Sequence, residues 1–575
     1  MFKTVRIIWG LLRPTEQRDA ILLLILMIIS MGFETASVAL ILPVLTLFAG
    51  TGAQIPAGLK ALQAVLASDS HFAVVMLGVV LFFALKAAFL YFLSRRQAHF
   101  VFELQAFLSD RLFQGYLAKP YTFHLQHNSA QLTQVALNDT TQFARGAVMA
   151  CLTLGAEIFV LIGMTGLLII VEPWGALGVI LFLVLAALSF QNIWGRKLRA
   201  WGVQRQQLDG QRIQFLQEGI GAAKEIKILG REEAFLRNYA GPNHDFAALG
   251  ARQASLEAIP RFGLEFITVT GVVIVATALL FQGRSINTLV PILGVFAAAA
   301  FRLLPGISRL INNYSHLRFS LPSVHTMQTE LAAINTEIAA QKLLPSAKIP
   351  ANWSTIELQN VSYLYPGSSR VALPPISLTI QRGSVTGIMG PSGSGKTTMV
   401  EVLLGLLPPK QGKIMIGDLD LQTDLRGWQK QIGYVPQTIY LTDDTLRRNI
   451  AFGLKTDQID EDAINIALDT AHLWSLVRTL PQGLDTKVGE RGVRLSGGQR
   501  QRIGIARALY HNPTLLVFDE ATNALDHETE QTVLEATTKL KGEKTIVIVA
   551  HRRSSLEICD AIINLHAEDA TPALR

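Results

Sequence analysis

The chain has 575 residues, of which 50% are hydrophobic and only 17% are charged, and its formal net charge is +7. That length allows two or more domains, and the composition is apolar for a soluble protein. Cys151 and Cys559 stand alone, so the sequence indicates neither a disulfide framework nor a cysteine metal site.

The apolar residues are concentrated before about residue 320, whereas the remainder alternates apolar strands, helical patterns and polar turns. This change indicates a multidomain protein, with a membrane domain first and an α/β domain second. We expect a membrane domain over residues 1–320, a linker over residues 321–352 and an α/β domain over residues 353–575.

The first domain begins with an amphipathic segment, Met1–Arg18, which we expect to lie as a helix at the membrane interface. It continues with apolar runs long enough to cross a bilayer, which takes roughly 20 helical residues. The first run is too long for a signal peptide and lacks a small-residue cleavage site. The six predicted spans are Ile21–Phe48, Phe72–Leu93, Ala147–Val171, Trp174–Phe190, Phe262–Phe281 and Asn287–Leu304.

Basic residues precede the first span and fill the long segments after spans two and four, while the opposite connections are nearly free of Lys and Arg. The positive-inside rule therefore predicts that both termini and these long segments face the cytoplasm. The net charge thus requires no nucleic-acid partner. Helices that continue beyond the bilayer would carry two tips, Lys119–His127 and Gly230–Tyr239, deep into the cytoplasm, where they could touch a motor domain.

The second domain contains a phosphate loop. An apolar strand, Val385–Met389, leads into Gly390-Pro391-Ser392-Gly393-Ser394-Gly395-Lys396-Thr397, and helical spacing follows from Met399 to Leu407. In this context the loop amides and the helix start bind phosphate oxygens. Lys396 would neutralise the β and γ phosphates of ATP, and the Thr397 hydroxyl would bind Mg²⁺.

A second apolar strand, Leu515–Phe518, ends in two acids. The carboxyl end of a buried parallel strand opens into the ligand site of an α/β sheet. Asp519 would therefore hold Mg²⁺, directly or through water. Glu520 would polarise the attacking water, which makes it the candidate general base. A solvated strand end is the alternative if the loop at Lys396 were absent.

Leu495-Ser496-Gly497-Gly498-Gln499 lies between these two elements, and the ordered set resembles the ATP-binding cassette (ABC) family. The resemblance covers nearly all of residues 353–560. It implies an exporter-type half-transporter: six membrane helices in a type IV arrangement followed by an α/β P-loop ATPase domain. In that family the signature of one copy covers the nucleotide of another, which implies a homodimer that traps two ATP.

The same resemblance assigns further roles. It implies that Tyr365 stacks on adenine, that Gln437 joins metal and water, that Asp526 crosses the dimer and that His551 reaches the γ phosphate. Thr398 and residues Ser496, Gly497, Gly498 and Gln499 complete the expected ATP contacts. Departures from the family pattern are Asn523, Arg553 and a chain end without the usual glycine-bearing hairpin.

The membrane domain resembles the PglK-type flippases of lipid-linked oligosaccharides. The similar segments are Gly32-Phe33-Glu34-Thr35, Ile259–Glu265, Phe301–Pro305 with Arg309, and a small external helix within Gly50–Ser70. Charges in membrane segments usually face a partner or a cavity. We therefore expect Glu34, Arg261, Arg302 and Arg309 to contact the substrate, with guanidinium groups binding pyrophosphate. The alternative is that Arg261 pairs with Glu265 and that the others are ordinary cytoplasmic helix charges.

The sequence is thus interpreted as an ATPase that flips a lipid-linked oligosaccharide across a bacterial inner membrane. One alternative is an exporter of peptides, drugs or lipid A-like lipids with the same engine, since fold does not fix substrate. Another is an ATP-gated membrane regulator that does not pump, although a regulator has no need of Lys396, Glu520 and His551 together.

Overall fold

The computed structural model describes residues 2–40, 69–171, 173–281, 305–342, 348–521, 531, 535, 538–550, 556–565 and 573–574. The chain forms two compact units, Met1–Lys119 with Phe123–Ala339, and Pro120–Thr122 with Ala340–Arg575. The segment expected as a linker, residues 321–352, begins with helix α13 (Leu321–Lys342), and the first unit includes this helix as far as Ala339.

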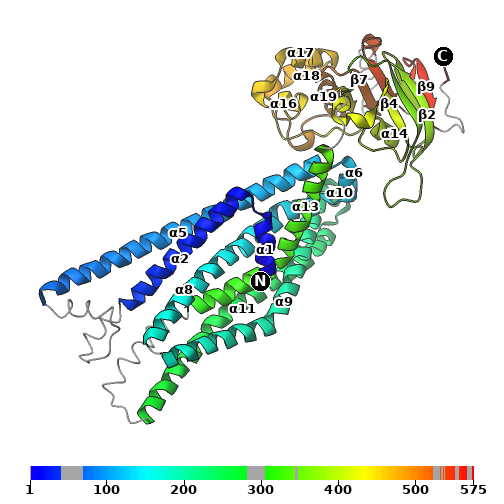
Figure 1. Ribbon diagram of the computed structural model, residues 1–575. Helices are drawn as coiled ribbons and strands as arrows, with labels where there is room; N and C mark the ends of the chain where they lie inside the picture. Colours follow the sequence, from blue (N-terminus) through cyan, green and yellow to red (C-terminus); the bar gives the residue numbers. More distant parts are fainter. Residues whose placement is uncertain are drawn as a thin grey trace. The chain divides into compact units, whose positions relative to one another are not determined.

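The described residues of the first unit are helical (Figure 1). Its further helices are α1 (Phe2–Leu11), α2 (Pro14–Ala39), α5 (Asp69–Ala118), α6 (Tyr121–Gln126), α7 (Ser129–Gln134), α8 (Met149–Val171), α9 (Pro173–Gly221), α10 (Ala223–Leu229) and α11 (Glu232–Phe281). Two π-helical stretches, Val135–Asp139 and Gln142–Val148, join α7 to α8.

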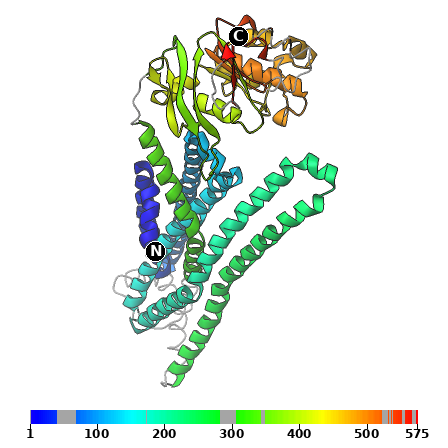
Figure 2. The same ribbon diagram turned by 90° about the vertical axis from the view of Figure 1, so that its right-hand side faces the viewer.

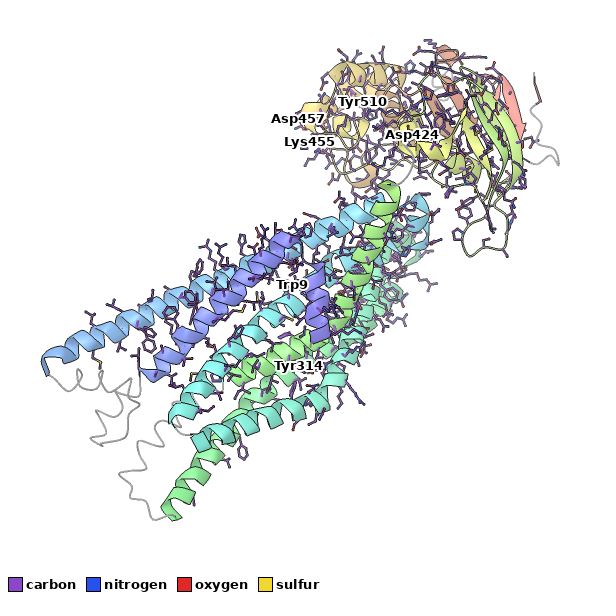
Figure 3. All side chains as sticks on the ribbon, in the orientation of Figure 1. Trp9, Tyr314, Asp424, Lys455, Asp457 and Tyr510 are labelled. Atoms are coloured by element: carbon purple, nitrogen blue, oxygen red, sulfur yellow. The ribbon has the colours of Figure 1, made fainter. Side chains whose placement is uncertain are left out.

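The amphipathic N-terminal helix is shorter than we expected. It ends at Leu11 rather than Arg18, because Pro14 begins α2, and proline favours the first turn of a helix. The Arg13 backbone N–H donates to Glu16 Oε2 at 2.7 Å and caps this second helix. Trp9 projects from α1 with 38% of its surface exposed (Figure 3), as an interfacial helix requires.

Five of the six predicted spans coincide at least in part with described helices. Within the described residues, three helical stretches are long and apolar enough to cross a bilayer, namely Pro14–Ala39, Met76–Ala118 and Ser129–Leu167. They include most of the described parts of spans one to three. Spans four and five fall within the backbones of α9 and α11. Span six, the end of span one beyond residue 40 and most of the predicted external helix lie outside the described residues.

Both predicted tips occur where long helices end. Helix α5 ends at Ala118 and the short α6 follows it. Helices α9 and α11 run side by side and are joined through α10 (Figures 1 and 2). Gly230 ends α10 in the left-handed conformation, with φ 60° and ψ 39°, which a residue without a side chain adopts at little cost.

The core of the first unit is aliphatic and aromatic. Met27 of α2, Leu104 of α5, Phe143 of the second π-helical stretch and Met327 of α13 are at most 1% exposed. These residues belong to one cluster, so α2, α5, α13 and the π-helical segment pack together. Close packing of these side chains holds together the helices that carry the charged residues.

The second unit contains two sheets. The antiparallel sheet has the order β2 (Leu373–Gln381), β1 (Thr355–Tyr363), β4 (Gln411–Ile416) and β5 (Leu419–Asp420). The other has the order β10 (Ala573–Leu574), β9 (Ala561–Asn564), β3 (Val385–Met389), β8 (Thr545–Val549), β7 (Leu515–Asp519) and β6 (Ile432–Val435). Strands β9 to β6 are parallel, and β10 pairs antiparallel with β9.

The register of the parallel sheet positions the site. Val549 of β8 pairs with Ile388 of β3 on one side and with Asp519 of β7 on the other. Strands β3 and β7 therefore end at the same edge, one strand apart. Their residues are buried, as expected for strands covered on both faces. The phosphate loop and the two acids consequently leave the sheet at neighbouring points.

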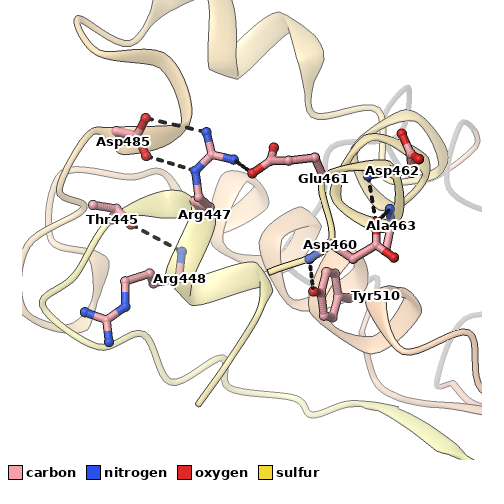
Figure 4. Close-up of polar contacts among 9 residues, drawn as sticks. All are labelled: Thr445, Arg447, Arg448, Asp460, Glu461, Asp462, Ala463, Asp485 and Tyr510. Carbon is pink, nitrogen blue, oxygen red and sulfur yellow. Dashed lines mark hydrogen bonds and ion pairs between the residues drawn. The ribbon is translucent and has the colours of Figure 1, made fainter. Parts of the chain in front are cut away.

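Helices of the second unit complete its two cores. They are α14 (Lys396–Leu403), α15 (Leu425–Gln429), α16 (Leu446–Ile450), α17 (Glu461–Thr470), α18 (Trp474–Thr479) and α19 (Gly497–Tyr510). Arg447 links α16 to α17 and to the segment at Asp485, because its guanidinium donates to Glu461 and, at 2.9 Å, to Asp485 (Figure 4). The Tyr510 hydroxyl accepts the Asp460 backbone N–H at 2.9 Å, which ties α19 to the start of α17 (Figure 4).

Candidate active site

The phosphate loop lies between β3 and α14, as the sequence predicts, although α14 begins at Lys396 and ends at Leu403 rather than running from Met399 to Leu407. The Lys396 ammonium is buried and donates to the carbonyl oxygens of Gly390 at 2.9 Å and Pro391 at 3.0 Å. These carbonyls hold the side chain across the loop. Phosphate oxygens are stronger acceptors for an ammonium, so ATP would draw Lys396 onto them.

Gly395 is required by the shape of the loop. Its φ is 93°, and a Cβ atom there would lie 2.5 Å from the Ala372 carbonyl oxygen. That separation is shorter than any real contact, and the carbonyl belongs to backbone that cannot turn away. The loop therefore approaches the segment before β2 closely, which only glycine permits.

The two acids at the end of β7 have different environments. Asp519 is buried, and burial raises the pKa of its carboxyl above the ordinary 3.8, opposed by a hydrogen bond from the Tyr434 hydroxyl at 3.3 Å. The negative charge of Glu520 raises the same pKa further, and Lys396 lowers it. The negative charge of this buried carboxylate is only partly balanced by Tyr434 and Lys396, so the position is suited to binding a cation.

Glu520 lies just beyond the strand and faces Gln437. The Gln437 amide donates to Glu520 Oε2 at 2.8 Å. The Glu520 backbone has φ 51°, a left-handed conformation that is uncommon for a residue with a side chain. Such conformations cost of order 1–3 kcal/mol and concentrate at functional sites. Here the turn directs the chain out of the sheet and brings Glu520 to the cleft.

Tyr365 reaches the first turns of α14. Its hydroxyl donates to Glu401 Oε2 at 3.1 Å and lies 3.3 Å from the Thr398 hydroxyl oxygen. Its ring packs edge-on against Tyr363 with the centroids 5.0 Å apart. Burial raises the Glu401 pKa, the Tyr365 hydrogen bond lowers it, and Asp519 raises it again. The sequence did not identify Glu401 or Tyr434, because nothing in the local pattern separates them from packing residues.

Several of these side chains line a cleft of about 480 Å³, although Asp519 is not among the residues that line it. It is lined by the predicted residues Tyr365, Ser392, Gly393, Gly395, Lys396, Thr397, Thr398, Gln437 and Glu520. Ser368, Arg370, Val371 and Ala372 also line it, and the sequence reasoning missed them. They lie between β1 and β2, and their position just after Tyr365 was the available signal. Gly390, Pro391 and Ser394 belong to the same loop without lining the cleft.

The donor set fits Mg²⁺. Thr397 offers an exposed hydroxyl at the start of α14, Asp519 a carboxylate, and Gln437 an amide oxygen. Magnesium prefers oxygen ligands and keeps several waters, with a few protein contacts beside the phosphates. Asp519 supplies the only negative charge of the three; burial raises its pKa, and a bound cation would favour its ionised form. The ion would neutralise charge on the transferred phosphoryl group.

The signature segment begins helix α19. Ser496 caps the helix: its hydroxyl accepts the Gln499 N–H at 3.2 Å, and its own N–H donates to Gln499 Oε1 at 2.8 Å. Arg500 supports the turn by donating to the Leu495 carbonyl at 2.8 Å. Among the described residues lining the cleft, none belongs to Ser496–Gln499. The remaining predicted ATP residues, Asp526 and His551, lie outside the described residues.

Two of the four charged residues expected to contact substrate have partners in the membrane unit. Glu34 of α2 lies 2.7 Å from the Lys86 ammonium of α5, which also donates to Ser37 at 2.8 Å. Arg309 pairs with Glu157 of α8 through two guanidinium nitrogens. The side chain of Arg261 and the whole of Arg302 lie outside the described residues.

The chain matches two family models. Residues 373–523 match the model described as ABC transporter, and residues 20–301 match the one described as ABC transporter transmembrane region. The chain is similar to proteins named ATP-dependent lipid A-core flippase. That of Nitrosococcus oceani is 32% identical over 80% of this chain and 76% of its own length, and that of Thiobacillus denitrificans is 31% identical over 81% and 79%. That of Cupriavidus metallidurans is 27% identical over 98% and 91%.

A solved structure has the same fold. A bacterial Atm1-family ABC exporter with ATP bound matches with a TM-score of 0.76 and 25% identity, over 95% of this chain and 93% of the other. The predicted fold class is thereby confirmed: a helical membrane domain is followed by a P-loop ATPase domain. The chain belongs to the ABC transporter family, as an exporter-type half-transporter whose ATPase activity is coupled to transport.

Proposed function

We propose that this protein works as a homodimer in a bacterial inner membrane and flips a lipid-linked oligosaccharide from the cytoplasmic to the outer leaflet. The observation that carries the ATP-driven part is the convergence of Lys396, Gln437 and Glu520 on one cleft. The lipid part is supported by the flippase names of the relatives and by the membrane segments quoted above.

The homodimer is supported by what one chain provides. It has one phosphate loop and one signature, and the signature does not contribute to the described lining of the cleft. The capping box fixes Ser496 and the two following glycines at the start of α19, where their donors could bind a phosphate of ATP held by a second copy of the chain. The tip between α9 and α11 also exposes apolar side chains, Ile220, Ile228, Leu229 and Leu236, which a partner chain would cover.

In this proposal ATP closes the two cassettes and the tips near Tyr121 and Gly230 transmit the motion to the spans. Glu520 accepts the proton of the attacking water, and Gln437 positions both the water and Mg²⁺. His551 reaches the γ phosphate and Asp526 crosses the dimer. Transport is then a population shift between inward-open and outward-facing states, driven by the preference of ATP for the closed pair. Both chain termini are cytoplasmic in this arrangement.

The substrate site is proposed around Arg309, Arg261 and Arg302. Arg309 keeps 43% of its side chain exposed while paired with Glu157, so its guanidinium has donors left for a pyrophosphate. Glu34 contributes by holding Lys86, whose ammonium would otherwise be an isolated charge in an apolar segment. A lipid A-core-like lipid is the alternative cargo. The names of the relatives support it, and it shares the phosphate and sugar chemistry of a lipid-linked oligosaccharide.

Reconstitution tests the cargo. Liposomes containing the protein would receive either a fluorescent lipid-linked oligosaccharide or a lipid A-core lipid, and a membrane-impermeant quencher would report ATP-dependent movement between leaflets. We expect ATP-dependent movement of the lipid-linked oligosaccharide, abolished by Glu520→Gln. Movement of the lipid A-core lipid alone would refute the favoured cargo. ATP hydrolysis without movement of either would favour a peptide or drug exporter, or a regulator.

A further inference from the structure

The membrane unit contains a second cavity, separate from the nucleotide cleft and lined by α7, the following π-helical stretch, α9 and α13. Its volume is about 590 Å³, within the range of pockets that hold small molecules. The lining residues precede predicted span three, follow predicted span four or lie on α13, so the expected topology places the cavity on the cytoplasmic side of the bilayer.

The lining is rich in side-chain amides. They come from Asn128, Gln131, Gln134, Gln206, Gln207, Gln211 and Gln214. Thr326 and Thr329 add hydroxyls, and Asp139 and Glu330 add carboxylates. Among the described lining residues there is neither Lys nor Arg, and His325 is the one side chain that can carry a positive charge, so a phosphate or pyrophosphate would find little counter-charge beside the two carboxylates. Ala130 and Val135 are the apolar side chains among the described lining residues.

A buried carboxylate fixes two of these amides. Asp139 is 1% exposed, and it accepts from Gln206 Nε2 at 2.8 Å, Gln134 Nε2 at 3.3 Å and the Ser323 hydroxyl at 2.8 Å. An amide that faces a carboxylate must present its NH₂ group, which determines its orientation. Gln206 Nε2 also donates to the Thr326 hydroxyl at 2.9 Å, and Gln134 Nε2 donates to the backbone carbonyl oxygen of Gln206 at 3.1 Å.

This arrangement determines what the pocket offers. The NH₂ groups of Gln134 and Gln206 are already committed, so their carbonyl oxygens are the acceptors left for a ligand. Gln131, Gln207 and Gln211 are exposed and present both donor and acceptor. Gly210 keeps the wall open between them, since a Cβ there would come within 3.1 Å of Gln134 Oε1.

We propose that this amide-lined pocket binds uncharged sugar residues. Each sugar hydroxyl both donates and accepts, and neighbouring hydroxyls match the paired donor and acceptor of a planar amide. Carboxylates that accept hydrogen bonds strengthen such recognition. An uncharged polyhydroxyl group can therefore pair with the amides and hydroxyls without bringing a negative charge next to Asp139 and Glu330. Identifying that sugar as the head group of a transported lipid rests on the function proposed above, whereas the affinity for sugar does not.

Binding can be measured on the full chain in nanodiscs by saturation-transfer NMR. The probes are the neutral trisaccharides maltotriose and N-acetylchitotriose, with inorganic pyrophosphate as an anionic control. The test variant is Gln131→Ala/Gln211→Ala, which removes two exposed pocket amides. The matched control is Gln217→Ala/Gln328→Ala, which removes exposed amides from α9 and α13 outside the pocket. ATP hydrolysis without sugar should be the same in all three proteins.

We expect at least one trisaccharide to bind and the pocket variant to weaken it by roughly tenfold or more, because two hydrogen bonds to the ligand are lost. The control variant should bind as the wild type does. Absence of trisaccharide binding, equal binding by both variants, or pyrophosphate binding that the pocket variant removes would each overturn the proposal.

A second arm separates the two sources of the sugar. ATPase stimulation by the free trisaccharide and by a polyprenyl-linked form of it would be compared in wild type and pocket variant. Stimulation by the lipid-linked form alone, lost in the variant, would support a transported head group. Stimulation by the free sugar alone would support the pocket as a sugar-binding site but would overturn its role in transport. If no glycolipid is flipped while trisaccharide binding depends on Gln131 and Gln211, the proposed function fails and the sugar site stands.

Discussion

Replacing Glu520 with Gln should nearly stop ATP turnover while preserving ATP binding. The substitution exchanges one carboxylate oxygen for an NH₂ group and leaves the size of the side chain unchanged. Gln437 lies 2.8 Å from the carboxylate, so the new amide can still bond it through its remaining oxygen. The left-handed backbone at this position costs a glutamine about what it costs a glutamate, so the fold should be retained.

The expected loss follows from the role of a general base. Positioned proton transfer contributes typically 10²–10⁴-fold, and each tenfold corresponds to about 1.36 kcal/mol of activation free energy. We therefore expect kcat to fall by about 10²-fold or more, equivalent to roughly 3–5 kcal/mol. The assay is steady-state ATPase in nanodiscs together with retention of labelled ATP after gel filtration.

The control is Glu543→Gln, which alters a carboxylate that is 71% exposed and does not line the cleft. It should hydrolyse ATP at the wild-type rate. A fall of less than tenfold in Glu520→Gln, or a failure of that variant to retain ATP, would contradict the assignment of Glu520.

Three further predictions concern individual side chains. Asp519 has a raised pKa, so its preference for the protonated form in the folded state stabilises the cassette at low pH and is lost as pH rises through that pKa. Asp519→Asn should therefore raise the melting temperature of the Mg-free protein at neutral pH while abolishing ATPase, and a lower melting temperature would contradict this. Ser496→Ala removes a helix cap and should lower the free energy of unfolding of the cassette by about 1 kcal/mol in chemical denaturation, and an unchanged value would show that the cap is dispensable. Lys86→Met removes the ammonium that pairs with Glu34 and should destabilise the membrane unit by roughly 3–5 kcal/mol, whereas Glu34→Gln/Lys86→Met should recover most of that loss in a thermal unfolding measurement. A double variant as unstable as the single one would show that the loss does not come from the uncompensated charge of Glu34.

The ATP site was largely predictable from sequence because its chemistry depends on local backbone geometry. Strand β3, the glycine-rich loop and the helix at Lys396 are consecutive, so spacing alone indicated phosphate binding. Likewise the apolar run before Asp519 predicted a buried strand, and the structure places that strand one strand away from β3. The left-handed conformation of Glu520 could not be predicted, since nothing in its local sequence requires it.

The partners of the membrane charges and the second cavity could not be predicted from sequence, because both arise from packing between segments that are far apart in the chain. The sequence predicts that Glu34 and Arg309 contact the substrate, but it did not predict their partners, Lys86 and Glu157, which are far away in the sequence. No local periodicity indicates such pairs. The amide pocket combines side chains from three separate helical segments around Asp139, and each of its glutamines taken alone resembles an ordinary polar surface residue.

Each ATP site takes its phosphate loop from one chain and its signature from the partner, if the proposed homodimer is correct. A mixed dimer tests this directly, with Lys396→Ala in one chain, Ser496→Arg in the other and Glu520→Gln in both so that ATP is retained. In the mixed dimer one site would combine the intact loop with the intact signature, whereas neither parent dimer would contain such a site. We predict that the mixed dimer retains one ATP per dimer and that both parents retain none. Retention by the mixed dimer no greater than that of the parents would contradict a site shared between two chains.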